Sequence, residues 1–278
     1  MDLQTERDQA EGPGLKKAAS EQDLAERLFA QTNIDDRIDA ARALASIGKP
    51  DCIQVLIGAF SDSNYIFRAK LIKVISKIEH PDVAGVVLQG IGDEDPYVRK
   101  TSIESGGYLA DAGIVEALAM ALRDEEINVR ESAIIALERN KDVVSVVKVL
   151  STVLSDHHWN LRREAVEVLG KTGHPDSVEP LRKMLKDSDP EVRRSALMAL
   201  SNVDGETIVA SAVAALGDHD MGVKLEALTV IGNLADSSIV PTLEELARQE
   251  GTNTMIRRYT AEVIALINER SGQREYDK

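Results

Sequence analysis

An aspartate and a basic residue six positions later recur along most of this chain at a nearly constant interval. The pairs are Asp62 and Arg68, Asp93 and Arg99, Asp124 and Arg130, Asp156 and Arg162, Asp187 and Arg193, and Asp218 and Lys224. Each pair follows the previous one by 31 residues, with one step of 32. A fixed period of this length indicates one supersecondary unit that has been copied and stacked. We therefore predict one elongated repeat domain.

The sixth repeat shows the unit most clearly. Asp189 and Pro190 provide an N-cap followed by proline at the first helical position. Ala196 and Leu200 then lie four residues apart on one helical face, and a turn at 204–205 precedes a second apolar helix that ends near Leu216. The pattern predicts an all-α fold, a right-handed α-solenoid of helix pairs.

The period also sets the expected boundaries. We predict seven helix pairs at 32–60, 61–91, 92–122, 123–154, 155–185, 186–216 and 217–247, with a C-terminal cap at 248–270. A helix starting at the N-cap Ser20 closes the first end, so the solenoid spans 20–270. The polar segments 1–19 and 271–278 are predicted to be tails. Gly106 and Gly107 fall inside a predicted helix, where a kink is expected because each costs about 1 kcal/mol relative to alanine.

Composition excludes several classes of function. The net charge is −14, which repels a phosphate backbone, so we expect no nucleic-acid partner. Aromatic residues are only 3% of the 278, so the core must be built from Ala, Val, Leu and Ile. No apolar run approaches the roughly 18 residues of a membrane span, and the single cysteine permits no internal disulfide. We expect a cytoplasmic protein, without membrane insertion, that is a monomer in isolation.

The repeat has a recognisable consensus. Asp-x-Asp-Pro-x-Val-Arg-x-x-Ala-x-x-Ala-Leu, continuing into Gly-x-x-Gly-x-Pro-Asp-x-Val-x-Pro-Leu, resembles the short bacterial HEAT repeat of phycobiliprotein lyases. Residues 162–185 and 187–200 carry it best, and it extends over about 35–247. The resemblance implies a solenoid of HEAT-like pairs. It also implies an alternative function, a phycobilin lyase or lyase-like chromophorylation factor, because those lyases attach bilins to phycobiliprotein cysteines.

A second enzyme of similar architecture, deoxyhypusine hydroxylase, depends on His-Glu pairs that bind a di-iron centre. The five histidines of this chain are instead followed by Pro81, His158, Trp159, Pro175 and Asp220. We find no catalytic constellation, and we predict no catalytic residue, no metal and no cofactor.

Three local features have competing interpretations. The aspartate and basic residues of the repeating pairs, which we call the Asp–Arg ladder, are interpreted as a structural ladder that fixes the stacking of repeats, and an anion-binding track is the alternative. His157 and His158 beside Trp159 suggest a metal site, but the repeat places the other histidines too far away to complete it. Cys52 lies where the other repeats hold mostly apolar residues, so packing is favoured over reactivity.

The second helices carry the predicted partner-binding residues, because in HEAT-like stacks these helices line the concave surface. The residues are Val55, Val86, Leu88, Glu116, Met120, Val149, Arg182, Lys183 and Val213, with Ala214 and Lys186 at neighbouring outward positions. Most are apolar, and only the fifth pair is plainly basic. We predict a non-enzymatic scaffold or adaptor that binds a protein partner here. The alternative that these side chains are buried between repeats stays open at this point.

Overall fold

The computed structural model describes residues 19–107, 109, 111–140, 142–205, 207–249 and 253–276, and these residues contain helices and no strand. Apart from residue 19, the predicted N-terminal tail lies outside them. The α-helices are α1 (Glu21–Phe29), α2 (Ile34–Ile47), α3 (Pro50–Ala59), α4 (Tyr65–Ile75), α5 (Val83–Ile91), α6 (Pro96–Gly106), α7 (Ala112–Ala121), α8 (Ile127–Glu138), α9 (Val143–Leu150), α10 (Trp159–Thr172), α11 (Val178–Met184), α12 (Pro190–Val203), α13 (Ile208–Ala215), α14 (Met221–Leu234), α15 (Val240–Arg248) and α16 (Thr254–Tyr276). Short 3₁₀ turns follow α9 and precede α11 and α15.

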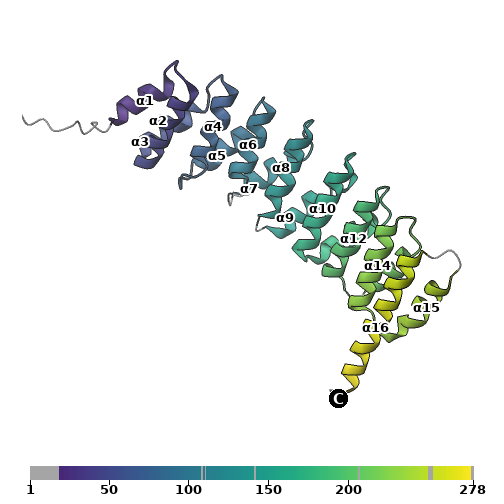
Figure 1. Cartoon of the computed structure of the whole chain (residues 1–278). Helices are drawn as coiled ribbons and strands as arrows, with labels where there is room; N and C mark the ends of the chain where they lie inside the picture. The colour runs from purple at the N-terminus through teal and green to yellow at the C-terminus, as the bar shows by residue number, and fades with distance from the viewer. Residues whose placement is uncertain are drawn as a thin grey trace, which may run out of the picture. The chain divides into compact units, whose positions relative to one another are not determined.

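The chain divides into two compact units after Gly106. In the first unit, the first helices of successive pairs, α2, α4 and α6, contact one another in order, and α3 and α5 form the second-helix layer (Figure 1). The helix α1 packs against α2 and α3 and so covers the start of this stack. An all-α solenoid of helix pairs is therefore confirmed.

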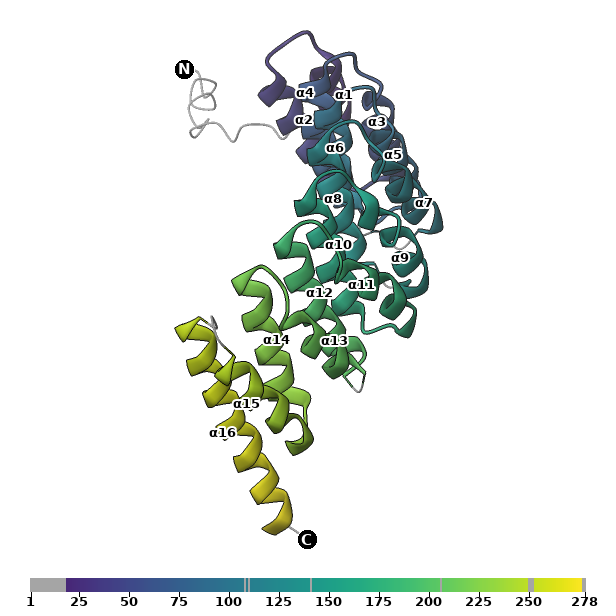
Figure 2. The ribbon, with the colours of Figure 1, turned by 90° about the vertical axis from the view of Figure 1, so that its right-hand side faces the viewer.

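The second unit repeats this arrangement over more pairs. The first helices α8, α10, α12 and α14 contact one another in order, and α16 packs against α14 and α15 in the place of a further first helix. Figure 2 shows the second helices α9, α11 and α13 as a layer beside α10, α12 and α14. The unit is thus built from two layers of helices with an apolar core between them.

The helix ends follow from capping chemistry written in the sequence. Ser20 forms a capping box with Asp23, and Oδ1 of Asp189 accepts the backbone N–H of Glu191 at 2.9 Å at the start of α12. Gly48 and Gly173 end α2 and α10 with φ of 70° and 61°, a conformation that glycine adopts without a Cβ clash. The turns within the pairs are therefore specified locally.

Small residues allow the first helices to approach closely. Ala165 and Ala196 are fully buried in α10 and α12. At Gly170 a Cβ would lie 2.6 Å from the Cβ of Ala199, so only glycine fits this contact between α10 and α12. A core poor in aromatic side chains therefore goes together with close packing of the helices.

Two expectations about helix extent are corrected. Gly106 is the last residue of α6 rather than an interior one, and a Cβ there would lie 2.5 Å from Cγ2 of Val87, so the glycine serves close packing where a kink was expected. The last helix continues to Tyr276, beyond the predicted end at 270. One reason is that Nη1 of Arg270 donates to the carbonyl oxygens of Gly232 at 3.0 Å and Asn233 at 2.6 Å, which ties this part of α16 to the end of α14.

Candidate partner-binding surface

Within each unit, arginines of the Asp–Arg ladder connect two successive repeats. Nε and Nη2 of Arg162 both donate to the carboxylate of Asp187 at 2.7 Å, and its Nη1 donates to the carbonyl oxygen of Asp156 at 2.8 Å. Arg193 repeats this geometry on Asp218 and on the carbonyl of Asp187. The six-residue spacing therefore brings the arginine to the aspartate's backbone carbonyl, whereas the carboxylate partner lies 25 residues ahead.

In the first unit Arg68 makes the same contacts. Its Nε and Nη2 donate to the carboxylate of Asp93 at 2.8 and 2.7 Å, and its Nη1 donates to the carbonyl of Asp62 at 2.8 Å. The carboxylate of Asp62 is contacted in turn by Nη2 of Arg37 at 2.5 Å. Sequence reasoning missed Arg37, although its position 25 residues before Asp62 was the signal that could have identified it.

Each ladder carboxylate also organises its own bend. Oδ1 of Asp187 accepts the backbone N–H of Asp189 at 2.8 Å, and Asp218 does the same for Asp220 at 2.8 Å. Burial alone would raise the pKa of the Asp187 carboxyl, but hydrogen bonds from Arg162 and from the Asp189 N–H outweigh it and hold that pKa below its ordinary value. The hydrogen bond from Arg193 likewise lowers the pKa of Asp218. These carboxylates are charged structural groups.

Arg130 departs from this geometry, whereas Arg99 and Asp124 make the usual contacts within their own bends. Where the period lengthens to 32, Nε of Arg130 contacts Asp156 at 3.0 Å, and its Nη2 lies 3.0 Å from Nδ1 of His158. Nη1 of Arg99 donates to the carbonyls of Asp93 and Glu94 at 3.0 and 2.9 Å. The carboxylate of Asp124 accepts the backbone N–H of Glu126 at 3.0 Å.

Lys224 ends the series. Twenty-five residues after it stands Gln249 instead of an aspartate. Within the described residues Lys224 has no ion pair, so the ladder stops before the C-terminal cap.

His158 contacts charged side chains at the bend between two repeats. Nδ1 of His158 lies 3.2 Å from Oδ1 of Asp156, beside the Arg130 guanidinium. Trp159 is the first residue of α10, and the Arg163 guanidinium lies 6.0 Å from its ring centroid. No group of three or more His, Cys, Asp or Glu side chains within the described residues is arranged to hold a metal ion.

Cys52 lies at the start of α3 and is only 3% exposed. Burial raises the pKa of its thiol, and the nearby Glu21 carboxylate, 3.8 Å from Sγ, acts in the same direction. The thiolate is therefore disfavoured, and the side chain acts as a packing residue.

The predicted partner-binding residues of the first unit do not all reach the surface. Val55 and Leu88 are half-buried, but Val86 is only 3% exposed. The prediction that Val86 faces out of the core is wrong, because α5 packs against α6 of the next repeat as well as against α4. Helical phase within α5 does not reveal this second contact.

In the second unit the predicted residues are more accessible. Met120 is 77% exposed on α7, and Glu116 and Lys183 are exposed, while Val149, Arg182 and Val213 are half-buried. One repeat position is exposed throughout this unit, on α7, α11, α13 and α15 and in the turn that follows α9. These residues, Met120, Thr152, Lys183, Ala214 and Glu245, follow one another at intervals of 32, 31, 31 and 31 and are called the second-helix row below.

Two hollows lie on either side of α13. The larger, of about 690 Å³, lies between α11 and α13 and is lined by Arg182, Lys183, Lys186, Ser211 and Ala214 among others. The smaller, of about 510 Å³, lies between α13 and α15. Gly217 lines both, so the two hollows meet at the end of α13.

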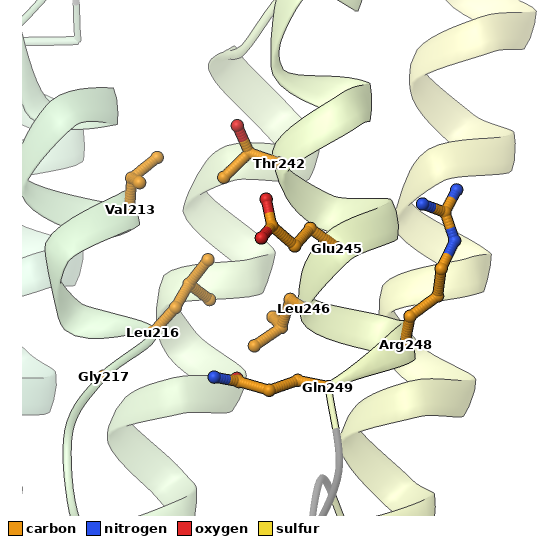
Figure 3. A pocket seen from close by; sticks show the side chains of 8 residues that line it. All are labelled: Val213, Leu216, Gly217, Thr242, Glu245, Leu246, Arg248 and Gln249. Atoms are coloured by element: carbon orange, nitrogen blue, oxygen red, sulfur yellow. The ribbon is translucent and has the colours of Figure 1, made fainter.

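Figure 3 shows the smaller hollow with Val213 and Leu216 on the α13 side and Thr242, Glu245 and Leu246 on the α15 side. The Glu245 carboxylate points toward α13, whereas the Arg248 side chain points away from it. Sequence reasoning missed Glu245, although its place 31 residues after Ala214 was the available signal.

Comparison with known sequences identifies the family. A profile described as HEAT repeats matches residues 21–93, 84–151 and 147–220, which together span more than half of the chain. The chain belongs to the HEAT-repeat family. The narrower resemblance to the phycobiliprotein-lyase type of repeat stays a prediction.

Solved structures agree with this fold. The Escherichia coli protein YibA is 22% identical with a TM-score of 0.55, over 89% of this chain and 93% of YibA. A chain from a structure of Kap95p with RanGDP is 12% identical with a TM-score of 0.60, over 88% of this chain and 40% of that chain. At these identities the likeness shows the fold alone.

A curated relative carries an enzyme name. The deoxyhypusine hydroxylase of Gibberella zeae is 30% identical over 138 residues, which are 45% of this chain and 41% of the hydroxylase. The chain thus matches less than half of that relative's length. The donor set here does not fit the metal centre expected for such an enzyme, because no histidine is followed by glutamate and the described residues hold no suitable cluster.

Among the described residues, no helix is long and apolar enough to cross a membrane.

Proposed function

We propose that this chain is a non-enzymatic scaffold that binds a protein partner through the second-helix surface of its second unit. The observation that carries the proposal is the pair of adjoining hollows around α13, bordered by exposed members of the second-helix row. A binding surface of this kind needs shape and exposed apolar groups, and it needs no catalytic group.

The exposed members of the second-helix row on this surface are not required by the fold. The apolar side chains that pack α13 into the core, such as Ile208 and Ala212, are buried on the helix face opposite to Ala214. Met120 and Ala214 are instead exposed, and an exposed apolar side chain contributes little to folding. Their exposure is consistent with a surface that becomes covered when a partner binds.

The match to deoxyhypusine hydroxylase favours a second candidate, a related hydroxylase. That candidate requires histidine–glutamate ligand pairs, which this sequence lacks. Its test is metal analysis after the protein is incubated with Fe(II) and desalted. We expect far less than one iron per chain, and one or two firmly bound equivalents would favour the hydroxylase over the scaffold.

The alternative of a bilin lyase has less support from this surface. None of the residues lining the two hollows is aromatic, whereas a flat conjugated tetrapyrrole gains affinity by stacking on aromatic rings. A visible absorbance shift on mixing with a linear tetrapyrrole would favour the lyase. We expect no shift.

The scaffold itself is tested with charge introduced at two places. Met120→Glu and Ala214→Glu alter the second-helix row, and Met198→Glu, at a residue 46% exposed on the first helix α12, is the matched control. Tagged wild type and variants are used for affinity purification from the native source, with quantitative mass spectrometry of bound proteins and circular dichroism to verify folding. We expect bound proteins that Met198→Glu retains and the two row variants lose. If all three folded variants retain the same proteins as wild type, the proposal is wrong.

A further inference from the structure

The hollow between α11 and α13 has an excess of positive charge that the fold does not use. Arg182 is engaged, because its Nη2 lies 2.7 Å from Oδ2 of Asp204 and 2.5 Å from Oγ1 of Thr207. Lys183 and Lys186 are exposed, and neither forms an ion pair with any residue that the structure describes. Two unpaired lysines side by side are notable in a chain whose net charge is −14.

The hollow between α13 and α15 contains an unpaired negative charge. The carboxylate of Glu245 points toward α13 (Figure 3), and no ion pair is found for it in the described part of the chain. Arg248, the nearest candidate on the same helix, is held by Glu244 at 2.7 Å instead. Lys183, Ala214 and Glu245 occupy one repeat position on three successive second helices, so positive, neutral and negative groups follow one another along the second-helix row.

We propose that the two hollows together bind an extended segment of the partner protein with a carboxylate side chain at one end, small apolar residues in the middle and a lysine or arginine at the other end. This inference rests on the proposed scaffold function and gives its partner a chemistry. Stacked helix layers are roughly 10 Å apart and an extended chain advances about 3.3 Å per residue, so the segment has about six residues.

The charge order also argues against other ligands. A nucleic acid or a wholly acidic segment would satisfy Lys183 and Lys186 but would place negative charge against Glu245. A wholly basic segment would place positive charge against Lys183 and Lys186. Only a segment with both signs, separated by a neutral centre, complements Lys183, Ala214 and Glu245 together.

The test is selection from a peptide library on the full-length protein. The library holds eight-residue peptides whose two end positions on each side vary among Glu, Lys and Ser, with Ala, Val or Leu in the middle. We expect enrichment of peptides with Glu at one end and Lys at the other. Fluorescence anisotropy of the enriched peptides, with a labelled oligo-thymidylate as a separate probe, then gives affinities.

Three variants make the selection decisive. Lys183→Glu with Lys186→Glu is expected to weaken the enriched peptides about tenfold, as two partly exposed ion pairs allow. The matched control Lys73→Glu with Lys77→Glu, at exposed lysines of the first unit, is expected to change the affinity less than twofold. Adding Glu245→Lys to the Lys183 and Lys186 changes reverses the charge at both ends of the proposed peptide site, so binding is expected to return with the peptide in the opposite direction.

The outcomes separate this inference from the scaffold proposal. The inference is overturned if no charge pattern is enriched, if purely acidic peptides or the oligo-thymidylate bind best, or if the triple change does not restore affinity. The scaffold proposal survives each of these results as long as Met120→Glu and Ala214→Glu remove the native partner. If those variants also have no effect, both proposals fail together.

Discussion

Replacing Arg162 with methionine tests whether the Asp–Arg ladder holds successive repeats together. The Arg162 side chain is 11% exposed and the Asp187 side chain 7% exposed, and their two hydrogen bonds are 2.7 Å long. Methionine keeps much of the aliphatic volume but leaves a nearly buried carboxylate without its cation. Breaking a buried ion pair typically costs about 3–5 kcal/mol. Because Asp187 keeps the backbone N–H of Asp189, we expect a loss near the lower end, about 3 kcal/mol.

The loss is measured as the free energy of unfolding in urea, followed by far-ultraviolet circular dichroism. Repeat arrays can unfold in parts, so hydrogen exchange in α10 and α12 should be recorded as well. Arg194→Met is the matched control, because Arg194 pairs with Glu191 at 2.7 Å where both side chains are more than 40% exposed. An exposed pair of this kind is worth about 0.5 kcal/mol.

A double-mutant cycle then identifies the cause. If the unpaired carboxylate is the problem, adding Asp187→Asn to Arg162→Met should cost less than the sum of the two single changes, with a coupling of about 1–3 kcal/mol. Equal losses for Arg162→Met and Arg194→Met, or strictly additive single changes, would refute the idea that the ladder stabilises the stack.

Three further predictions follow from the same structure. Folding lowers the pKa of Asp187 and of Asp218. Their contribution to stability is therefore fully present above the unfolded pKa of about 4 and is lost as pH falls through the lower folded pKa. Melting temperatures measured between pH 7 and pH 2 should decrease in the range below pH 4. Cys52 is buried with a raised pKa, so its reaction with a thiol reagent at pH 8 should be at least about a hundredfold slower than that of free cysteine and should become fast only in urea; fast labelling of the folded protein would contradict its packing role. Gly170→Ala should lower the free energy of unfolding by about 1–3 kcal/mol, because the new methyl group would lie 2.6 Å from Cβ of Ala199, and an unchanged urea midpoint would show that α10 and α12 can separate at no cost.

The repeat architecture could be predicted because its signals are local. The 31-residue period, the Asp189 cap before Pro190 and the glycines that end α2 and α10 all act within a few residues, and the structure shows the corresponding helices and caps. The carboxylate contacts are less local. The ladder was expected to form bonds within and between repeats, but the spacing of six did not reveal that the carboxylate of Asp187 contacts Arg162, 25 residues earlier in the preceding repeat.

Exposure on the second helices could not be predicted in the same way. Val86 and Met120 were both expected to face outward, yet they are 3% and 77% exposed. Helical phase gives the direction of a side chain relative to its own helix, but its burial depends on how the next repeat packs against that helix.

The repeat unit, its period and the helical-repeat class can all be read from the order of residues, because they depend on patterns within about 31 positions. Which charged side chains form ion pairs within the fold, and which stay unpaired, follows only from the packing of the repeats. This packing pairs Arg182 with Asp204 and Arg193 with Asp218, while Lys183, Lys186 and Glu245 are left without partners among the described residues around the hollows of α13. That distinction depends on distances between side chains from different repeats, and these distances exist only once the helices have stacked.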